Sequence, residues 1–379
     1  MKNSRLPSAL LLLPIGALLG VIAPLAAAPE LALNLVWSRV ADVNGEAGSI
    51  ESSEFSPDGR RIVSGSKFDN SVIMWRTSDG HELWRTTVAA EIERVGWSPD
   101  GKVVAACSED FMVTILDAAT GQVVKTIPHT SGIDALTWSH HGRWLATGEE
   151  HVRHPDGRIT GKVRLFRMPE GTVEREGDFG ETVNFLTFTA DDQLLVAAGH
   201  DGLVRVFATA DMKLAREFKA DPTLHLTCVD LTPDNRYIAA SGYGGAISVW
   251  EFATGKLVKR FNQTGRKIET LAWSRDGQYL FTAGHDPSIH VTRLRDILDK
   301  DQTEVYAAYK SAPTDYMEYL HVSPNGAFVT SAHQDGMIRL WVFMNEDPAF
   351  NTKRHRWVTA EQAKLQEALK KKSAPAAGR

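Results

Sequence analysis

Histidines are the side chains of this sequence best suited to chemistry, because a neutral imidazole binds metals and exchanges protons near neutral pH. His200, His285 and His333 occupy similar short turns, and His151 and His154 lie in a longer turn of the same kind. A zinc site needs three or four ligands about 2 Å from the ion. Because these turns belong to separate units of the chain, we predict no metal site and expect histidines that bond to neighbouring backbone or aspartate groups.

Two further segments contain residue types found in active sites. Ser139-His140-His141 has a nucleophile beside two bases, but a triad requires the base to touch the nucleophile, and adjacent residues on a hairpin point to opposite sides. The glycine-rich run 242–245 lacks the strand-to-helix context of a phosphate site, and the sequence has no Cys-x-x-Cys-His, P-loop or His-Glu-x-x-His motif. We therefore interpret both segments as turns and predict no catalytic residues, no cofactor and no enzyme activity.

The composition excludes several classes of protein. The chain has 379 residues, with 42 Lys+Arg against 47 Asp+Glu for a net charge of -5, and 43% of its residues are hydrophobic. These values are typical of a globular protein, and the acidic sum argues against nucleic-acid binding, which needs a basic surface. Cys107 and Cys228 are too few for a disulfide scaffold or a four-cysteine metal site, so we expect two buried thiols.

The N-terminal segment 1–29 has the features of a targeting signal. Lys2 and Arg5 precede an apolar run over 9–28 that ends in three alanines, the small-residue pattern that a signal peptidase accepts. The run is also long enough to remain as a transmembrane anchor. Both alternatives predict a periplasmic or secreted protein, which contacts the membrane through residues 1–28 if the signal is not cleaved.

The C-terminal segment 344–379 has its own composition, with eight basic and four acidic residues. Thr359 and Gln362 fit a capping box and predict a short helix through about Lys372, followed by a disordered end. The folded domain is therefore expected over residues 30–343, between the signal and this basic extension.

Residues 30–343 repeat one pattern seven times. In each unit an apolar residue is followed five positions later by a second apolar or aromatic residue and then by a Ser/Thr turn, as in Ile50, Phe55 and the turn 56–59. The turns begin at residues 56, 98, 139, 189, 232, 274 and 323, which are 41 to 50 residues apart. A period of about 40–45 residues is typical of propellers and other repeat architectures.

The pattern within each unit predicts four antiparallel strands, which together make one propeller blade. Short alternating runs between Gly, Asp and Pro turns favour strands over helices. Leu33–Val40 is typical of a strand but has no unit before it, and the seventh unit ends after its third strand, at Phe343. We therefore predict an all-β, seven-bladed β-propeller of four-stranded antiparallel blades, closed by strand 33–40 as the outer strand of the last blade.

The repeated units resemble those of the WD-repeat β-propeller family over about residues 33–343, and the N-terminal signal indicates an exported bacterial member. The resemblance implies a buried Trp–Ser–His–Asp hydrogen-bond network in the blades. We expect only a partial network, because no third strand ends in Trp-Asp and no Gly-His pair precedes a first strand. The aspartate of the turn between second and third strands is kept at Asp69, Asp110, Asp201, Asp286 and Asp335.

The resemblance also implies a non-catalytic scaffold that binds a protein or peptide partner. We call the face that carries the turns between second and third strands the top face, and loops on a rigid scaffold are where binding specificity tends to lie. The insertion 149–160 lengthens the third of these turns, and a second insertion, 294–301, lies on the opposite face. Rim aromatic residues are common anchors for partners. The predicted partner-binding residues are Phe68, Phe111, His151, Arg153, His154, Arg158 and Tyr243.

Two other functions stay open at this point. One is an exported propeller enzyme, a lyase or hydrolase that works at the channel mouth with His200, His285 or His333, since propellers host many chemistries. The other is a membrane-tethered envelope assembly factor, which requires that residues 1–28 remain in the mature protein.

Overall fold

The computed structural model describes residues 31–41, 48–220, 225–299, 303, 305–310, 315–345 and 351. The predicted signal 1–29 lies outside the described residues, as does nearly all of the predicted C-terminal extension, including the helix expected after Thr359. In the described part of the chain, no helix is both long and apolar enough to cross a membrane.

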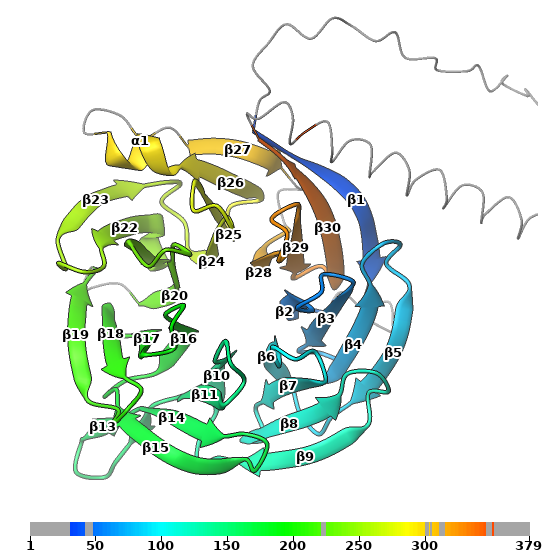
Figure 1. The fold of residues 1–379 in the computed structure, drawn as a ribbon, viewed down its shortest axis with the longest axis vertical. Helices are drawn as coiled ribbons and strands as arrows, with labels where there is room; N and C mark the ends of the chain where they lie inside the picture. The colour runs from blue at the N-terminus through cyan, green and yellow to red at the C-terminus, as the bar shows by residue number, and fades with distance from the viewer. Residues whose placement is uncertain are drawn as a thin grey trace, which may run out of the picture.

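Seven four-stranded antiparallel sheets, one for each sequence repeat, surround a central axis in the part of the chain that the structure describes (Figure 1). The first strand of each repeat lies next to the axis, and the outermost strand forms the rim. This arrangement confirms the predicted seven-bladed, all-β propeller. Blades one to four comprise, from the axis outward, β2 (Ile50–Phe55), β3 (Arg61–Ser66), β4 (Ser71–Arg76) and β5 (Glu82–Thr87); β6 (Ile92–Trp97), β7 (Val103–Ser108), β8 (Met112–Asp117) and β9 (Val123–Pro128); β10 (Ile133–Trp138), β11 (Trp144–Glu149), β14 (Lys162–Arg167) and β15 (Thr172–Asp178); and β16 (Val183–Phe188), β17 (Leu194–Gly199), β18 (Leu203–Ala208) and β19 (Leu214–Lys219).

The remaining blades follow the same plan, and the two insertions add short elements of their own. Blades five to seven comprise β20 (Leu226–Leu231), β21 (Tyr237–Gly242), β22 (Ala246–Glu251) and β23 (Leu257–Asn262); β24 (Ile268–Trp273), β25 (Tyr279–Gly284), β26 (Ser288–Arg293) and β27 (Val305–Lys310); and β28 (Met317–Val322), β29 (Phe328–His333), β30 (Met337–Met344) and β1 (Ala32–Val40). The first insertion forms the hairpin of β12 (Val152–Arg153) and β13 (Ile159–Thr160), the second forms helix α1 (Leu294–Leu298), and a single 3-10 turn, η1, covers Tyr243–Gly245.

The Ser/Thr turns owe their shape to a local hydrogen-bond pattern. In blade one, Ser56 Oγ donates to Asp58 Oδ1 at 2.6 Å and accepts from the backbone N–H of Arg61 at 3.0 Å, while Gly59 takes the left-handed φ of 68° that ends the turn. Blade three has histidines in place of the acid, and the Nδ1 atoms of His140 and His141 instead contact Asp192 of blade four, at 2.7 and 2.5 Å. The turn interpretation of Ser139-His140-His141 is therefore confirmed.

Strand β1 closes the ring as predicted. It runs antiparallel to β30, with Ala32 opposite Met344 and Val40 opposite Met337, and so becomes the outer strand of blade seven. Its side chains also reach blade one, because the Trp37 indole N–H donates to the carbonyl of Thr77 at 2.8 Å. One strand therefore joins the last blade to the first through both backbone and side chains.

The hydrophobic core lies between neighbouring blades. The described residues form seven buried clusters, and each cluster combines side chains of two adjacent blades, including one cluster between blades seven and one. Trp37, Phe55 and Trp75 pack there against Ile338 and Leu340. Burial of these faces is worth about 25 cal/mol for each Å² of apolar surface removed from water. Cys107 and Cys228 are free thiols buried in two other clusters, which confirms the expectation for them.

The expectation of a partial Trp–Ser–His–Asp network is wrong for blade seven, where the network is complete. The Trp341 indole donates to Ser331 Oγ at 2.8 Å, Ser331 lies 2.6 Å from His333 Nε2, and His333 Nδ1 lies 3.0 Å from both carboxylate oxygens of Asp315. Burial lowers the pKa of His333, so the neutral ring accepts from Ser331 and donates to Asp315. The histidine ends the second strand, β29, and the aspartate precedes the first strand, the reverse of the order expected from the family.

Three turn aspartates contact a basic or histidine side chain on the third strand of their own blade. Asp201 contacts Arg205 at 2.6 Å and Asp286 contacts His290 at 2.9 Å, in each case four residues further on and on the third strand of the same blade. Asp335 pairs with Arg339 in the same way. The repeated geometry of the turn therefore places the acid beside an arginine or histidine side chain of the third strand.

We expect Trp37→Ala to lower the free energy of unfolding by about 3–5 kcal/mol, because it empties a buried site where β1 meets blade one. Trp37 is 6% exposed, whereas Leu35 on the same strand is 49% exposed. Leu35→Ala should therefore cost less than ~1 kcal/mol. Urea denaturation of the two variants measures both losses, and equal losses would show that β1 does not act as the closing element.

We expect Ser331→Ala to lower the free energy of unfolding by about 2 kcal/mol, because both Trp341 and the buried His333 lose their hydrogen bond to Ser331. Ser64 occupies the matching place in blade one, where Trp75 donates to it at 2.9 Å. Ser64→Ala removes a single side-chain bond and should cost about 1 kcal/mol. Thermal unfolding compares the two, and a Ser64→Ala loss as large as that of Ser331→Ala would contradict a role for the His333–Asp315 pair.

Candidate functional site

A β-bulge occurs at the same place in the innermost strand of all seven described blades. In each strand the ladder shifts between the first and the third residue, so the second residue has no partner on the neighbouring strand. Bulges re-aim side chains, and here they turn the second residue toward the axis. The seven bulged residues all line one cavity at the top of the channel: Glu51, Glu93, Asp134, Asn184, Thr227, Glu269 and Glu318.

This cavity is strongly acidic. Glu109 and Glu150, from the turns that follow the second strands of blades two and three, add to the five acidic bulge residues. We call this cavity the acidic mouth. Its seven acids are Glu51, Glu93, Glu109, Asp134, Glu150, Glu269 and Glu318. The cavity has a volume of about 260 Å³, and Lys67, Arg94 and Lys267 are the cations among its lining residues. The acids therefore outnumber the cations that face them.

The electrostatics of the acidic mouth are unfavourable to its own charges. Burial, followed by repulsion from Glu318, raises the pKa of Glu51 to about 7. Burial and the charge of Glu269 raise the pKa of Glu318 to about 7, and burial and the charge of Glu150 do the same for Asp134. Since a carboxyl normally titrates near pH 4, these groups hold protons up to neutral pH unless a cation comes close.

Two lysines that line the acidic mouth offset part of the repulsion between its carboxylates. Lys67 Nζ lies 2.7 Å from Glu93, and Lys267 Nζ lies 2.6 Å from Glu269. Lys267 also lies 4.6 Å from the centre of the Tyr243 ring, which links the mouth to an exposed aromatic residue. The remaining acids have no such close cation among the lining residues of the cavity.

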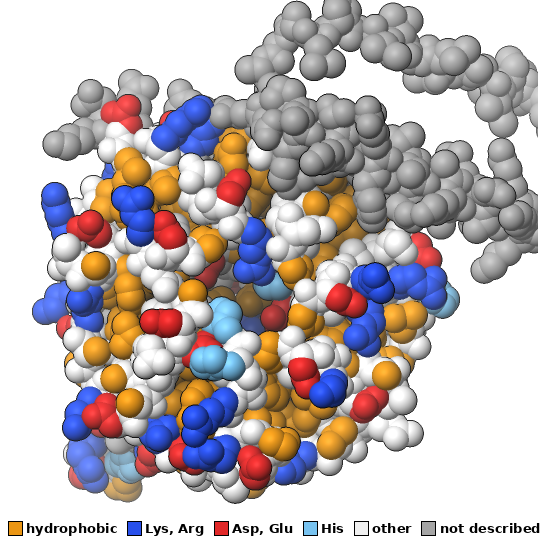
Figure 2. Space-filling model, in the orientation of Figure 1, with side chains coloured by type: hydrophobic (Ala, Val, Ile, Leu, Met, Phe, Trp, Pro, Cys, Tyr) orange, Lys and Arg blue, Asp and Glu red, His pale blue; other side chains and the backbone are white. Residues whose placement is uncertain are grey.

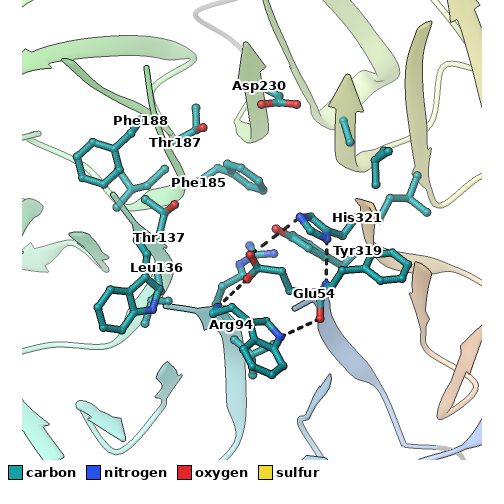
Figure 3. A pocket seen from close by; sticks show the side chains of 18 of the residues that line it. Glu54, Arg94, Leu136, Thr137, Phe185, Thr187, Phe188, Asp230, Tyr319 and His321 are labelled. Carbon is teal, nitrogen blue, oxygen red and sulfur yellow. Dashed lines mark hydrogen bonds and ion pairs between the residues drawn. The ribbon is translucent and has the colours of Figure 1, made fainter. Parts of the chain in front are cut away.

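Arg94 narrows the channel below the acidic mouth. Its guanidinium lies 4.7 Å from the centre of the Tyr319 ring and 5.2 Å from that of Phe185, and the two rings stack at 6.2 Å (Figure 3). These three side chains come from blades two, seven and four and meet near the axis. Arg94 lines both the acidic mouth and a second cavity, of about 310 Å³, on the other side of this constriction.

The titratable side chains Glu54 and His321 in the lower cavity accept hydrogen bonds from backbone N–H groups (Figure 3). Glu54 accepts from the backbone N–H of Trp97 at 3.2 Å, and burial raises its pKa to about 8. His321 Nδ1 accepts from the N–H of Phe55 at 3.1 Å, and burial lowers its pKa to about 3. Burial therefore favours the uncharged forms of both Glu54 and His321. Figure 2 shows a hollow at the centre of one face of the ring, edged by charged and histidine side chains.

The three aromatic residues predicted to bind a partner are all exposed on the top face. Phe68 is 69% exposed, Phe111 is 45% exposed and Tyr243 is 43% exposed. Phe68 follows Lys67, and Tyr243 itself lines the acidic mouth. The turns that carry the aromatic residues therefore border the acidic mouth on blades one, two and five, through Lys67, Glu109 and Tyr243.

The four residues predicted from the first insertion lie elsewhere. Hairpin β12–β13 stands at the edge of the ring in Figure 1, and its contacts are largely internal: His154 bonds to Thr160 at 2.9 Å and Arg158 pairs with Asp156 at 2.7 Å. Arg153 is exposed on the same hairpin. His151 lies at the base of the hairpin and faces blade four. The seven predicted residues thus do not form one continuous site.

The acidic mouth was missed by the sequence analysis, although a signal for it exists. In every repeat the first apolar residue is followed by the bulge residue, and in five of the seven repeats that residue is Glu or Asp. Aligned repeats would have shown the acids at one position. The bulge that points them to the axis leaves no mark in the residue types.

The histidines of the enzyme hypothesis lie in three different environments. His333 belongs to the network of blade seven, and His285 stacks on Tyr316 at 4.7 Å with its Nε2 3.0 Å from Glu269. His200 instead packs against His225 at 4.6 Å, and burial lowers its pKa. The three do not converge, so the geometry assembles no acid–base set from them.

Three clusters among the described residues could hold a metal ion, and one of them, Asp315, His333 and Asp335, belongs to the hydrogen-bond network of blade seven. The carboxylates of Glu93, Glu109 and Asp134 lie within 4.8 Å of one another in the acidic mouth, and so do ligand atoms of His151, Glu181 and His200 on the top face. The sequence places His200 and His151 in turns of the same kind, but the contact between them is visible only in the structure.

Models of known protein families match most of the propeller. The WD domain, G-beta repeat, matches residues 37–76, 173–207, 213–251, 255–292 and 312–342, and the anaphase-promoting complex subunit 4 WD40 domain matches residues 66–141. Together these matches cover more than half of the chain. The chain belongs to the WD40-repeat β-propeller family. Propellers of this family typically act as protein-interaction scaffolds.

The similar WD40 proteins come from eukaryotes. The cell division cycle 20.1 protein of Arabidopsis thaliana, a cofactor of the APC complex, is 26% identical over 288 residues, which are 72% of this chain and 59% of the relative. Eukaryotic translation initiation factor 3 subunit I of Aspergillus terreus is 24% identical over 204 residues, 49% of this chain and 58% of the relative, and protein groucho of Drosophila melanogaster is 23% identical over 169 residues, 44% and 22% of the two chains. The chain spans about three fifths of the length of the first curated relatives that it matches. None of these relatives supports a bacterial, exported origin, which remains a prediction from residues 1–29.

We expect stability to fall as the pH rises from 5 to 8. The Glu51 and Glu318 carboxyls have pKa values of about 7 when folded and 4.5 as free groups, so the folded state holds protons that the unfolded state has released across this window. Glu318→Gln removes one repelling charge and should add roughly 1–2 kcal/mol at pH 8, with no gain at pH 5. Melting temperatures at both pH values measure the effect.

The control for this prediction is Glu170→Gln, which changes an exposed acid in a turn at the rim. It should leave the melting temperature unchanged at both pH values. A melting temperature of the unmodified protein that rises between pH 5 and pH 8 would contradict the repulsion described for the acidic mouth.

Proposed function

We propose that the chain is a non-catalytic WD40 scaffold whose top face binds a positively charged segment of a protein partner in the acidic mouth. The observation that carries the proposal is the set of five acidic bulge residues at one strand position, pointed at one cavity by seven equivalent bulges. A charge pattern repeated around the ring is well placed to receive a cationic side chain on its axis.

The energetics of the mouth favour such a ligand. Glu51, Asp134 and Glu318 hold protons near neutral pH because burial and mutual repulsion oppose their charges. A lysine or arginine side chain that enters the cavity replaces repulsion with attraction and allows the protons to leave. The acidic mouth has a volume of about 260 Å³, just below the ~300–1,000 Å³ typical of ligand pockets. The cavity therefore suits a side chain rather than a folded domain.

The aromatic residues around the mouth supply the apolar part of the same surface. Phe68, Phe111 and Tyr243 are exposed within the turns that border it. The cores of protein interfaces are enriched in aromatic residues, including Tyr and Phe. A partner segment that combines a basic side chain with apolar neighbours therefore matches the charge and the shape of this face.

We expect a fluorescein-labelled octalysine peptide to bind the purified protein and an octaglutamate peptide not to bind. The double variant Glu51→Gln/Glu318→Gln should weaken octalysine binding about tenfold, or about 1.4 kcal/mol, because two carboxylates no longer attract the ligand. Binding should also strengthen as the pH rises from 6 to 8, since the carboxyls with pKa values of about 7 then lose their protons. Fluorescence anisotropy measures each affinity.

Glu170→Gln on the rim serves as the matched control and should leave the affinity unchanged. The same loss in this control as in the mouth variant would mean that general negative charge attracts the peptide. Binding that weakens between pH 6 and pH 8 would also contradict the proposal.

The location of this scaffold is part of the proposal. Lys2, Arg5 and the apolar run 9–28 support export to the periplasm or beyond, either as a free protein or as a membrane-tethered assembly factor. N-terminal sequencing of the mature protein distinguishes the two, because cleavage removes residues 1–28 and tethering retains them.

A further inference from the structure

The structure brings together three metal-binding side chains from neighbouring blades. His151 follows β11 in blade three, Glu181 precedes β16 in blade four, and His200 follows β17 in blade four. One ligand atom of each lies within 4.8 Å of those of the other two. All three side chains are half-buried on the top face.

Neighbouring groups already orient these side chains. The backbone N–H of Thr182 donates to Glu181 Oε2 at 3.2 Å, and Thr182 Oγ1 lies 2.8 Å from His151 Nδ1 and accepts from the His151 backbone N–H. His151 Nδ1 also lies 3.3 Å from Glu181 Oε2. One threonine thus positions two of the three side chains, in the way that outer partners hold the ligands of metal sites.

A fourth residue lies next to the cluster. His225 packs its ring edge-on against His200, with ring centres 4.6 Å apart, and its Nδ1 lies 2.6 Å from the His200 carbonyl oxygen. Because a carbonyl only accepts, this nitrogen carries the proton, and the Nε2 of a neutral His225 keeps its lone pair. The contact also restrains the backbone of His200.

We infer that His151, Glu181 and His200 form a binding site for a transition-metal ion of the Zn²⁺ type between blades three and four. Two imidazoles and one carboxylate are a common ligand set for zinc that leaves a fourth position open. Ligand atoms bound tetrahedrally to one zinc ion at about 2 Å lie roughly 3.3 Å from each other, so an ion would draw the more widely spaced side chains of this cluster together.

The charges around this site favour a cation overall. Glu150, adjacent to His151 in the chain, belongs to the acidic mouth, which His200 also lines. Lys267 lines the same cavity and could repel a bound metal ion. Its Nζ, however, is paired with Glu269 at 2.6 Å. Clusters of carboxylates alone occur on many surfaces, whereas paired imidazoles add the nitrogen donors that favour zinc over calcium or magnesium.

A bound ion would fix the base of hairpin β12–β13. His151 immediately precedes β12, while Glu181 and His200 belong to the neighbouring blade. The metal would therefore connect the insertion of blade three to blade four through coordinate bonds. This role does not depend on the partner proposed for the acidic mouth.

The test is titration of the tag-free, full-length chain with Co²⁺, whose visible absorption reports tetrahedral nitrogen and oxygen coordination. We expect one Co²⁺ per chain, displaced by one equivalent of Zn²⁺. His151→Ala and His200→Ala should each weaken binding about a hundredfold, because loss of outer partners alone costs about 10–100-fold. His285→Ala, in the equivalent turn of blade six, should leave binding unchanged.

Three results would overturn the site: no stoichiometric Co²⁺ binding, binding by His151→Ala and His200→Ala as tight as that of the unmodified protein, or a loss in His285→Ala as large as in those two variants. Circular dichroism confirms that each variant is folded before titration. Limited trypsin digestion tests the connection to the hairpin, since Arg153 and Arg158 are exposed cleavage points. Zn²⁺ should slow cleavage there in the unmodified protein but not in His200→Ala. If Zn²⁺ changed the cleavage rate equally in the two proteins, the connecting role would be overturned.

Discussion

The structure depends on the pairing of β1 with β30, because that pairing turns a row of seven sheets into a ring. Each blade has two apolar faces, and a row would leave one face of the first and last blades in water. In the ring, Trp37, Phe55 and Trp75 bury the face between blades one and seven just as other clusters do between the remaining blades. Closure between segments about 300 residues apart in sequence therefore completes every core at once.

The closed ring explains how the acidic mouth can exist. Carboxyls such as Glu51 and Glu318 repel one another, and burial adds to the cost of charging them, so a flexible chain would move them apart. The bulges sit on strands held by the ladder and by the interblade cores, which fix the acids in place. The stability that the interblade cores supply thus offsets the repulsion between the acids at the axis. Proteins commonly hold unfavourable binding-site groups in place in this way.

The features that could be predicted from the sequence are those that recur in every repeat or that leave a strand without a partner. The turns after Phe55 and its equivalents, the number of blades and the closure by strand 33–40 all followed from spacing and from strands left without partners. Features that depend on irregular geometry did not follow. The bulge that aims Glu51 at the axis has no residue signature, and the contact between His151 and His200 depends on the path of an insertion. The network of blade seven was missed because its aspartate, Asp315, lies before the first strand, where the family pattern places histidine.

Native-state hydrogen exchange read by mass spectrometry tests the central claim most directly. If closure holds the ring together, amides of β1 and β30 exchange only when the whole propeller unfolds, and their opening free energy equals that of the inner strands β2 and β28. Fast exchange of β1 while β2 and β28 stay protected would contradict the account, because the blades would then be stable without the closing strand.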